Sequence, residues 1–129
     1  MSAAGEPRWL LLDKSAAVRA PDLSRFPGEP CLCAITRFEL LYSARSPRHF
    51  EQLEEELEAF HELRMDAETF AIARVAQREL GGSSRHRVPI PDLLIAACAH
   101  QHRAAVLHLD RHYDTLARVL AFTALRLEA

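Results

Sequence analysis

Four carboxylates stand at points where a short apolar run ends or a helical pattern begins. They are Asp13 after "WLLL", Glu39 near the start of a helical pattern, Asp92 in "IPDLLIAACAH" and Asp110 after "AVLHL". If the apolar runs form parallel strands, their carboxyl ends lie at one edge of a sheet, and the four acids converge there. Clustered carboxylates repel one another, and a bound cation removes that cost. Oxygen ligands favour a hard ion such as Mg²⁺ or Mn²⁺, which serves phosphate chemistry by polarising a phosphoryl oxygen and activating water.

Each acid also has a simpler explanation as part of a helix terminus. Asp13 or Ser15 would cap the helix that follows the first apolar run, and Asp110 would do the same for the last helix. Thr36 and Glu39 have the spacing of a capping box, in which each side chain accepts a hydrogen bond from the other residue's backbone amide. The "PD" pair fits the first turn of a helix, where the dipole favours negative charge. Helix capping alone, however, does not predict four acids at one edge with no basic residue assigned to neutralise them.

The elements that position these acids follow from hydrophobic periodicity. Apolar runs bounded by polar residues, Pro or Gly are typical of buried strands, and the chain has "RWLLLD", "PCLCAI", "AAVLHLD" and, more weakly, "TALRL". Helical patterns cover residues 36–44, 47–64, 66–80, 91–102 and 111–120. Strands that alternate with helices predict an α/β fold with a parallel sheet covered on both faces.

The composition bounds the kind of protein. The chain has 129 residues, of which 49% are hydrophobic, so a single domain over residues 1–129 is expected. The absence of a long apolar run and of a signal pattern predicts a soluble, cytoplasmic protein. A formal net charge of −2 provides no global basic field for a nucleic acid. Cys31, Cys33 and Cys98 are expected as reduced core residues, and no paired spacing of the zinc-finger type is present.

Four segments resemble one protein family. "LLDKSA", "ITRFELLYSA", "IPDLLIAA" and "VLHLDRHYDTLA" occur in the order and approximate spacing of PIN-domain ribonucleases, and they are especially similar to the VapC-type toxins of toxin–antitoxin pairs. Each motif alone is weak, whereas the four together, over residues 9–117, are specific. The resemblance implies a three-layer α/β/α sandwich around a mainly parallel sheet. It also implies metal-binding acids supported by two hydroxyls: Asp13, Glu39, Asp92 and Asp110, with Ser15 and Thr36.

Residues around the last acid have open roles. His108 stands where many members of the family carry a threonine. It would contact a substrate phosphate or a neighbouring carboxylate, or else be a half-buried strand histidine satisfied by the backbone. Asp114 lies four residues after Asp110, so a helix that starts near residue 111 would turn it away from the strand end, as an outer or surface acid. His112 and Tyr113 have no assigned role.

The most basic local stretch contains four arginines and a histidine. Surface solvation would explain it, and an alternative is contact with an RNA backbone. Its members are Arg74, Arg78, Arg85, His86 and Arg87.

The resemblance, together with the four acids, implies a metal-dependent endoribonuclease that cleaves structured cellular RNA and acts as the toxin of a type II toxin–antitoxin system. The resemblance implies a homodimer, and an antitoxin that covers an apolar groove near Phe38, Leu41 and Tyr42 and places a basic group among the acids. The alternatives are a Mg²⁺-binding receiver-type signalling domain and a non-catalytic PIN-like scaffold. A receiver-type site needs a paired acid near its first strand and a late lysine, and the sequence has neither. The presence of all four acids disfavours the scaffold.

Overall fold

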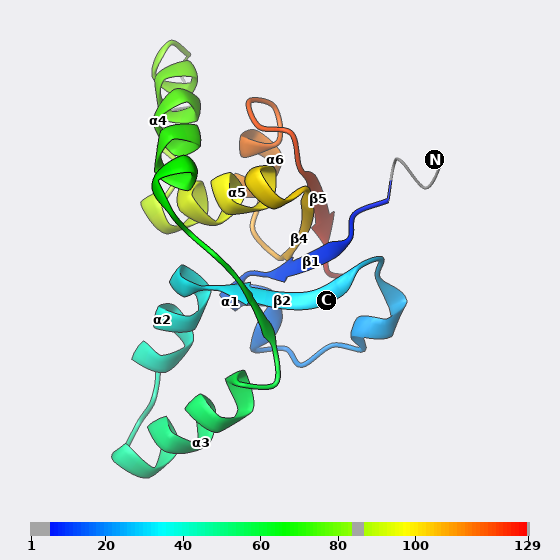
Figure 1. Ribbon diagram of the computed structural model, residues 1–129, viewed down its shortest axis with the longest axis vertical. Coiled ribbons are helices and arrows are strands. Elements are labelled where there is room, and N and C mark those ends of the chain that lie inside the picture. The colour runs from blue at the N-terminus through cyan, green and yellow to red at the C-terminus, as the bar shows by residue number, and fades with distance from the viewer. Residues whose placement is uncertain (1–5, 84–86, 129) are drawn as a thin grey trace.

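The protein is built around a five-stranded sheet whose strand order is β3-β2-β1-β4-β5 (Figure 1). The computed structural model describes residues 6–83 and 87–128. The strands are β1 (Trp9–Leu12), β2 (Glu29–Cys33), β3 (His61–Leu63), β4 (Ala104–His108) and β5 (Thr123–Arg126). Every neighbouring pair is parallel. The chain therefore starts at the central strand, extends the sheet on one side, and then returns to extend it on the other.

Helices cover both faces of this sheet (Figure 1). Helices α4, α5 and α6 lie on one face, whereas α1 and α3 lie on the opposite face with α2 beside them. The helical segments are α1 (Lys14–Ala17), the 3₁₀ turn η2 (Leu23–Arg25), α2 (Ala34–Tyr42), α3 (Pro47–Leu57), α4 (Ala67–Gly81), α5 (Ile90–His102) and α6 (His112–Leu116). This architecture confirms the expected three-layer α/β/α sandwich.

Side chains of the central strands alternate between two hydrophobic cores. Leu10 and Leu12 of β1 pack in the core beneath α1 and α3, and Leu11 packs in the core beneath α4 and α5. The same alternation separates Val106 from Leu107 in β4. Because both faces are covered by helices, both sets of side chains must be apolar, and the strands therefore read as continuous apolar runs.

The prediction of one helix over residues 47–64 is wrong beyond Leu57. Helix α3 ends there, and residues 61–63 form β3, which pairs with residues 31–33 of β2. Only Leu63 of the three β3 residues is buried, so no apolar run indicates a strand in the sequence. Pairing with β2, which is remote in the sequence, determines the extended conformation.

Other boundaries differ by smaller amounts. The last helix, expected over residues 111–120, is the single short helix α6 over residues 112–116. The weak strand pattern "TALRL" is confirmed as β5. Among the described helices, none combines the length and the hydrophobicity that crossing a bilayer requires.

Candidate active site

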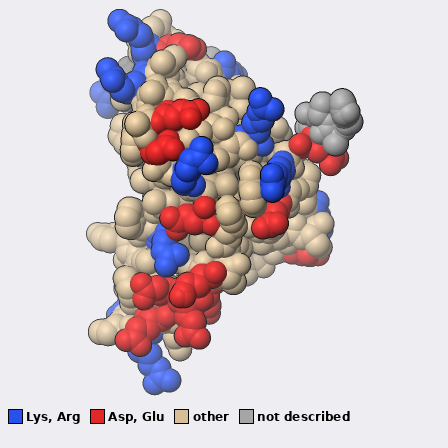
Figure 2. Space-filling model, in the orientation of Figure 1, with Lys and Arg blue, Asp and Glu red and all other residues tan. Residues whose placement is uncertain are grey.

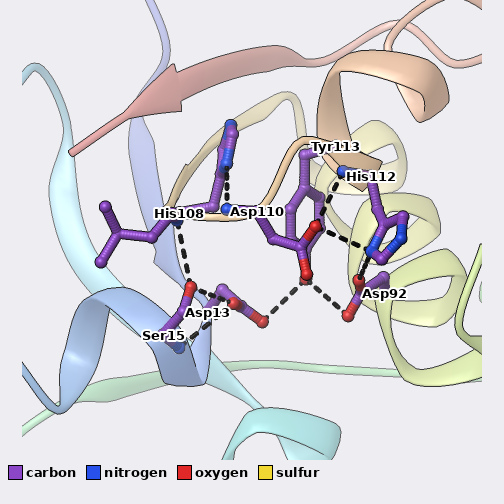
Figure 3. A network of polar contacts seen from close by, with 8 residues as sticks. Asp13, Ser15, Asp92, His108, Asp110, His112 and Tyr113 are labelled. Atoms are coloured by element: carbon purple, nitrogen blue, oxygen red, sulfur yellow. Dashed lines mark hydrogen bonds and ion pairs between the residues drawn. The ribbon is translucent and has the colours of Figure 1, made fainter. Parts of the chain in front are cut away.

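The carboxyl ends of β1 and β4 lie next to each other at the switch point of the sheet. Leu12 pairs with Leu107, and the connections that leave these two strands run to opposite sides of the sheet. Open parallel sheets bind ligands in the crevice at such a point. Asp13 and Asp110, which follow the two strands, both belong to a polar network at this edge (Figure 3).

Asp13 is both a helix cap and a member of this network. Its Oδ2 accepts hydrogen bonds from Ser15 N at 3.2 Å and from Ser15 Oγ at 2.6 Å, which caps α1. Ser15 Oγ accepts a hydrogen bond in turn from Leu109 N at 3.1 Å, so the segments after β1 and β4 are tied together. Asp13 Oδ1 accepts a hydrogen bond from the Tyr113 hydroxyl at 2.8 Å. Helix capping therefore explains the contacts of Oδ2, whereas Oδ1 contacts Tyr113 and takes no part in the cap.

Tyr113 connects two of the expected site acids, although its role was open in the sequence. Its hydroxyl lies 2.8 Å from Asp13 Oδ1 and 3.4 Å from Asp92 Oδ1 (Figure 3). The side chain is fully buried. Burial, and then the charge of Asp13, raise the pKa of the Tyr113 hydroxyl. The phenol therefore stays protonated and donates to the carboxylates.

Asp92 lies in the first turn of α5, where the helix dipole favours negative charge. The residue is only 8% exposed, and its Oδ2 is buried with no hydrogen-bond partner among the residues that the structure describes. Burial, followed by the charges of Asp13 and Asp110, raises the pKa of Asp92 to about 6. A carboxylate in this environment is costly unless a cation accompanies it.

His112 is a second network member that sequence reasoning did not assign. Its Nδ1 lies 2.7 Å from Asp110 Oδ1 and 3.3 Å from Asp92 Oδ2 (Figure 3). Its backbone N–H also donates to Asp110 Oδ1 at 3.0 Å, which fixes the start of α6 beside the acid. The only signal in the sequence is the two-residue spacing from Asp110, which places the imidazole near that acid only if the chain turns into a helix there.

Thr36 and Glu39 do not form the expected capping box. Helix α2 begins directly after Cys33, its N-cap, so Thr36 lies inside the first turn and Glu39 in the second. The buried Thr36 hydroxyl donates instead to Leu12 O at 2.9 Å and holds the end of β1. Glu39 is half-buried, and burial followed by the charge of Asp13 raises the pKa of its carboxyl group. Both residues therefore lie near the end of β1, although they do not cap each other.

His108 and Asp114 occupy different environments. His108 is fully buried, its Nδ1 accepts a hydrogen bond from Asp110 N at 3.1 Å, and its ring lies 4.9 Å from that of Tyr113. Burial lowers the pKa of His108, so the neutral ring is favoured. The backbone thus satisfies one ring nitrogen of His108, whereas Nε2 is buried without a hydrogen-bond partner among the described residues, and the residue is fully buried rather than half-buried. Asp114 is exposed on α6.

The described residues fit a divalent cation. One ligand atom each from Asp92, Asp110 and His112 lies within 4.8 Å of the other two. The charges of Asp13 and Glu39 also act on Asp92, so all four expected acids belong to one electrostatic cluster. Carboxylate oxygens with one imidazole nitrogen are suitable ligands for a divalent metal. The unpartnered Asp92 Oδ2 is the observation that points to such a ligand.

Comparison with known proteins places this arrangement in a family. Residues 8–119 match the family model described as PIN domain. The chain is 40% identical over 118 residues to Ribonuclease VapC17 of Mycobacterium tuberculosis, an alignment that covers 86% of this chain and 88% of that protein. It is 35% identical over 108 residues to Ribonuclease VapC51 of the same organism, covering 84% of this chain and 79% of the relative.

Solved structures share the fold. A crystal structure of VapBC-5 from Mycobacterium tuberculosis superposes with a TM-score of 0.75 at 24% identity, covering 94% of this chain and all (100%) of that chain. VapBC-1 from nontypeable Haemophilus influenzae gives a TM-score of 0.76 at 15% identity, with coverages of 91% and 96%. The receiver-type alternative is not favoured by these matches. The chain belongs to the PIN-domain family, among the VapC proteins.

Proposed function

We propose that this chain is a metal-dependent endoribonuclease and the toxin of a type II toxin–antitoxin pair. The observation that carries the proposal is the buried Oδ2 of Asp92, which has no hydrogen-bond partner in the described part of the chain. It lies in a cluster with the other acids at the switch point of a PIN-domain sheet. The metal-binding acids of the proposal are Asp13, Glu39, Asp92 and Asp110. A bound Mg²⁺ or Mn²⁺ would supply a Lewis acid and an activated water for phosphodiester hydrolysis.

The chain's own residues orient the acids. Tyr113 holds one oxygen of Asp13 and approaches one oxygen of Asp92, so these carboxylates cannot rotate freely. Ser15 and Thr36 hold the end of β1 against its neighbours. Because these contacts exist before substrate binds, the acids need little rearrangement to act on a phosphodiester.

Charge on the surface is consistent with an RNA substrate that approaches from one end. Figure 2 shows several Lys and Arg side chains at the end formed by α4, whereas Asp and Glu side chains gather over α3. Arg74 and Arg78 are exposed on α4, and Arg85 and His86 of the same basic stretch lie outside the described residues. Phosphate contacts from arginines would orient a structured RNA without reading its sequence. The acidic face over α3 would repel it.

Nuclease assays of a matched pair of aspartate variants test the proposal. Asp22 forms the same local cap as Asp13, because Ser24 N and Ser24 Oγ donate to its carboxylate at 3.2 Å and 2.6 Å. Asp22, however, is exposed and lies in the loop at η2. With purified protein, total RNA and Mg²⁺ or Mn²⁺, Asp13→Asn is expected to abolish cleavage and Asp22→Asn to retain it. Undiminished cleavage in excess EDTA, or equal activity of both variants, would remove the mechanism.

The proposal includes an antitoxin that covers the acids. Phe38 and Tyr42 are 66% and 91% exposed, and they line one shallow hollow together with Lys14 and Glu39. Leu41, the third residue of the expected groove, lines a neighbouring hollow with Phe50. An apolar segment bound on this surface would bring a guanidinium within reach of Glu39, and such a group neutralises carboxylates as a cation does.

Co-expression with the product of the neighbouring gene tests this partner. A stable complex without nuclease activity is expected, and Tyr42→Asp should weaken it. Phe70→Asp is the control, because Phe70 is an exposed aromatic residue on α4, on the other face of the sheet. A complex with full activity, or equal weakening by both variants, would contradict the assignment. A homodimer, a single domain over residues 1–129 and a cytoplasmic location complete the proposal.

A further inference from the structure

We infer that His112 is a nitrogen ligand of the metal, and that it makes the site select Mn²⁺ over Mg²⁺. The inference rests on the proposed metal-dependent function and deepens it, because the expected ligand set consisted of carboxylates alone. It concerns the imidazole Nδ1 that lies between Asp110 and Asp92.

The distances around His112 are those between neighbouring ligands of one ion. Two ligand atoms at right angles, each about 2.1 Å from a metal, lie about 3.0 Å from each other. Nδ1 lies 2.7 Å from Asp110 Oδ1 and 3.3 Å from Asp92 Oδ2, so the observed separations bracket that value. Within residues 6–83 and 87–128, neither His112 Nδ1 nor Asp92 Oδ2 has a hydrogen-bond partner of acceptable geometry, although both atoms are buried. The arrangement therefore does not have the geometry of a proton shared between imidazole and carboxylate.

The surrounding contacts leave His112 Nδ1 and Asp92 Oδ2 available to bind a ligand. Asp92 Oδ1 is approached by the Tyr113 hydroxyl at 3.4 Å, while Asp92 Oδ2 points toward the imidazole. The backbone N–H of His112 donates to Asp110 Oδ1, which holds the histidine and the acid in one turn. The His112 side chain is 35% exposed, so one side of the cluster stays open to water and substrate.

A nitrogen ligand changes which metal is preferred. Mg²⁺ is a hard ion that binds oxygen and retains water, whereas imidazole suits transition metals, for which affinity generally rises from Mn²⁺ onward. A neutral imidazole beside the acids adds no negative charge that would attract Mg²⁺, whereas an ion that bonds well to nitrogen gains a ligand. Mn²⁺ is the ion of the expected pair that gains from His112.

Electron paramagnetic resonance of bound Mn²⁺ tests the ligand directly, without reference to activity. Wild-type protein labelled with ¹⁵N-histidine is expected to show a ¹⁵N hyperfine coupling to the ion. His112→Asp should lose the coupling while still binding Mn²⁺ through oxygen. His61→Gln is the matched control, since His61 is exposed on β3 and stacks on Trp9. That variant should keep the coupling.

Calorimetric titration with Mn²⁺ and with Mg²⁺ tests the selectivity. Residues that only orient a ligand already change metal affinity by about 10- to 100-fold. The ratio of Mn²⁺ to Mg²⁺ affinity should therefore fall by at least about tenfold in His112→Asp and stay unchanged in His61→Gln.

Failure of the inference and failure of the proposed function give different results. Absence of the ¹⁵N coupling in the wild type, or an unchanged affinity ratio in His112→Asp, overturns the role of His112 even if RNA cleavage remains metal-dependent. A ¹⁵N coupling in a protein that cleaves no RNA supports the ligand and overturns the nuclease function instead.

Discussion

Tyr113 and Asp13 are 100 residues apart in the sequence, yet the Tyr113 hydroxyl donates a hydrogen bond to Asp13 Oδ1 at 2.8 Å inside the protein. The same hydroxyl lies 3.4 Å from Asp92 Oδ1. This neutral hydroxyl lies between two carboxylates and offsets part of the repulsion between their charges. This contact explains how the acids can lie close together before a cation binds.

Removal of this hydroxyl should destabilise the metal-free fold. In EDTA, Tyr113→Phe is expected to lower the free energy of unfolding by about 2 kcal/mol, because a buried hydrogen bond to a charged group is lost. Tyr42→Phe is the control, since Tyr42 is 91% exposed, and its change should stay within about 0.5 kcal/mol. Urea denaturation of the two variants measures both values. Equal stabilities of the two variants would show that the Tyr113 contact carries no energy.

Asp92→Asn should stabilise the metal-free protein while removing its activity. The substitution relieves repulsion with Asp13 and Asp110 in the network, so unfolding in EDTA should cost about 1–3 kcal/mol more than in the wild type. Mn²⁺ at about 100 times its dissociation constant should stabilise the wild type by about 2.7 kcal/mol, and the variant much less. Thermal unfolding in EDTA and in Mn²⁺ measures the pattern. If Mn²⁺ does not change the stability of the wild type, and the variant is less stable than the wild type in EDTA, Asp92 only stabilises the N-terminus of α5.

The stability of the metal-free chain should depend on pH through Asp92. Its folded pKa is raised to about 6 from the ordinary 3.8, so between these values the folded state holds a proton that the unfolded state has released. This residue therefore adds stability as the pH falls from about 6 toward 4, by at most about 3 kcal/mol, and the addition is absent above that window.

The difference between wild type and Asp92→Asn isolates this effect. Burial lowers the pKa of His108, which gives an opposite slope below about pH 6.5, but that slope is common to both proteins. The stability advantage of the variant in EDTA should shrink as the pH falls from 7 to 4.5 in denaturation experiments. Parallel pH curves for the two proteins would contradict the raised pKa of Asp92.

Asp110→Asn should abolish RNA cleavage, whereas Asp114→Asn should retain a substantial part of it. Asp110 contacts the imidazole of His112, while Asp114 is exposed on α6. An asparagine at position 110 can still accept the backbone hydrogen bond that starts α6, so the local turn is preserved and loss of charge is tested. Cleavage rates of the two variants at saturating Mn²⁺ provide the measurement. Equal loss would show that both acids bind metal or that the wrong acid was chosen.

The sequence alone was sufficient to predict the layers of the fold and the common location of the four acids. Strands buried on both faces must be apolar throughout, so β1, β2 and β4 are visible as runs, and parallel strands necessarily present their carboxyl ends at one edge. The positions of Asp13 and Asp110 after β1 and β4 follow from that rule. Resemblance of the four motifs supplied the family, which periodicity could not.

Only the tertiary structure decided the contacts that give these acids their chemistry. The Thr36–Glu39 spacing fits a capping box with Thr36 as the N-cap. Because β2 continues directly into α2, the N-cap is Cys33 instead, and the Thr36 hydroxyl donates to Leu12 O. Strand β3 exists because β2 offers an unpaired edge, not because residues 61–63 are apolar.

The contacts of His112 and Tyr113 at the site likewise could not be predicted from the sequence. Their side chains reach the acids because the chain turns into α6 immediately after Asp110, and the direction of that turn depends on packing against α5 and β4. A pattern of neighbouring residues determines which side chains can share an edge or a face. Distances of about 3 Å between side chains from different elements depend on how those elements pack, and this packing is a property of the whole fold.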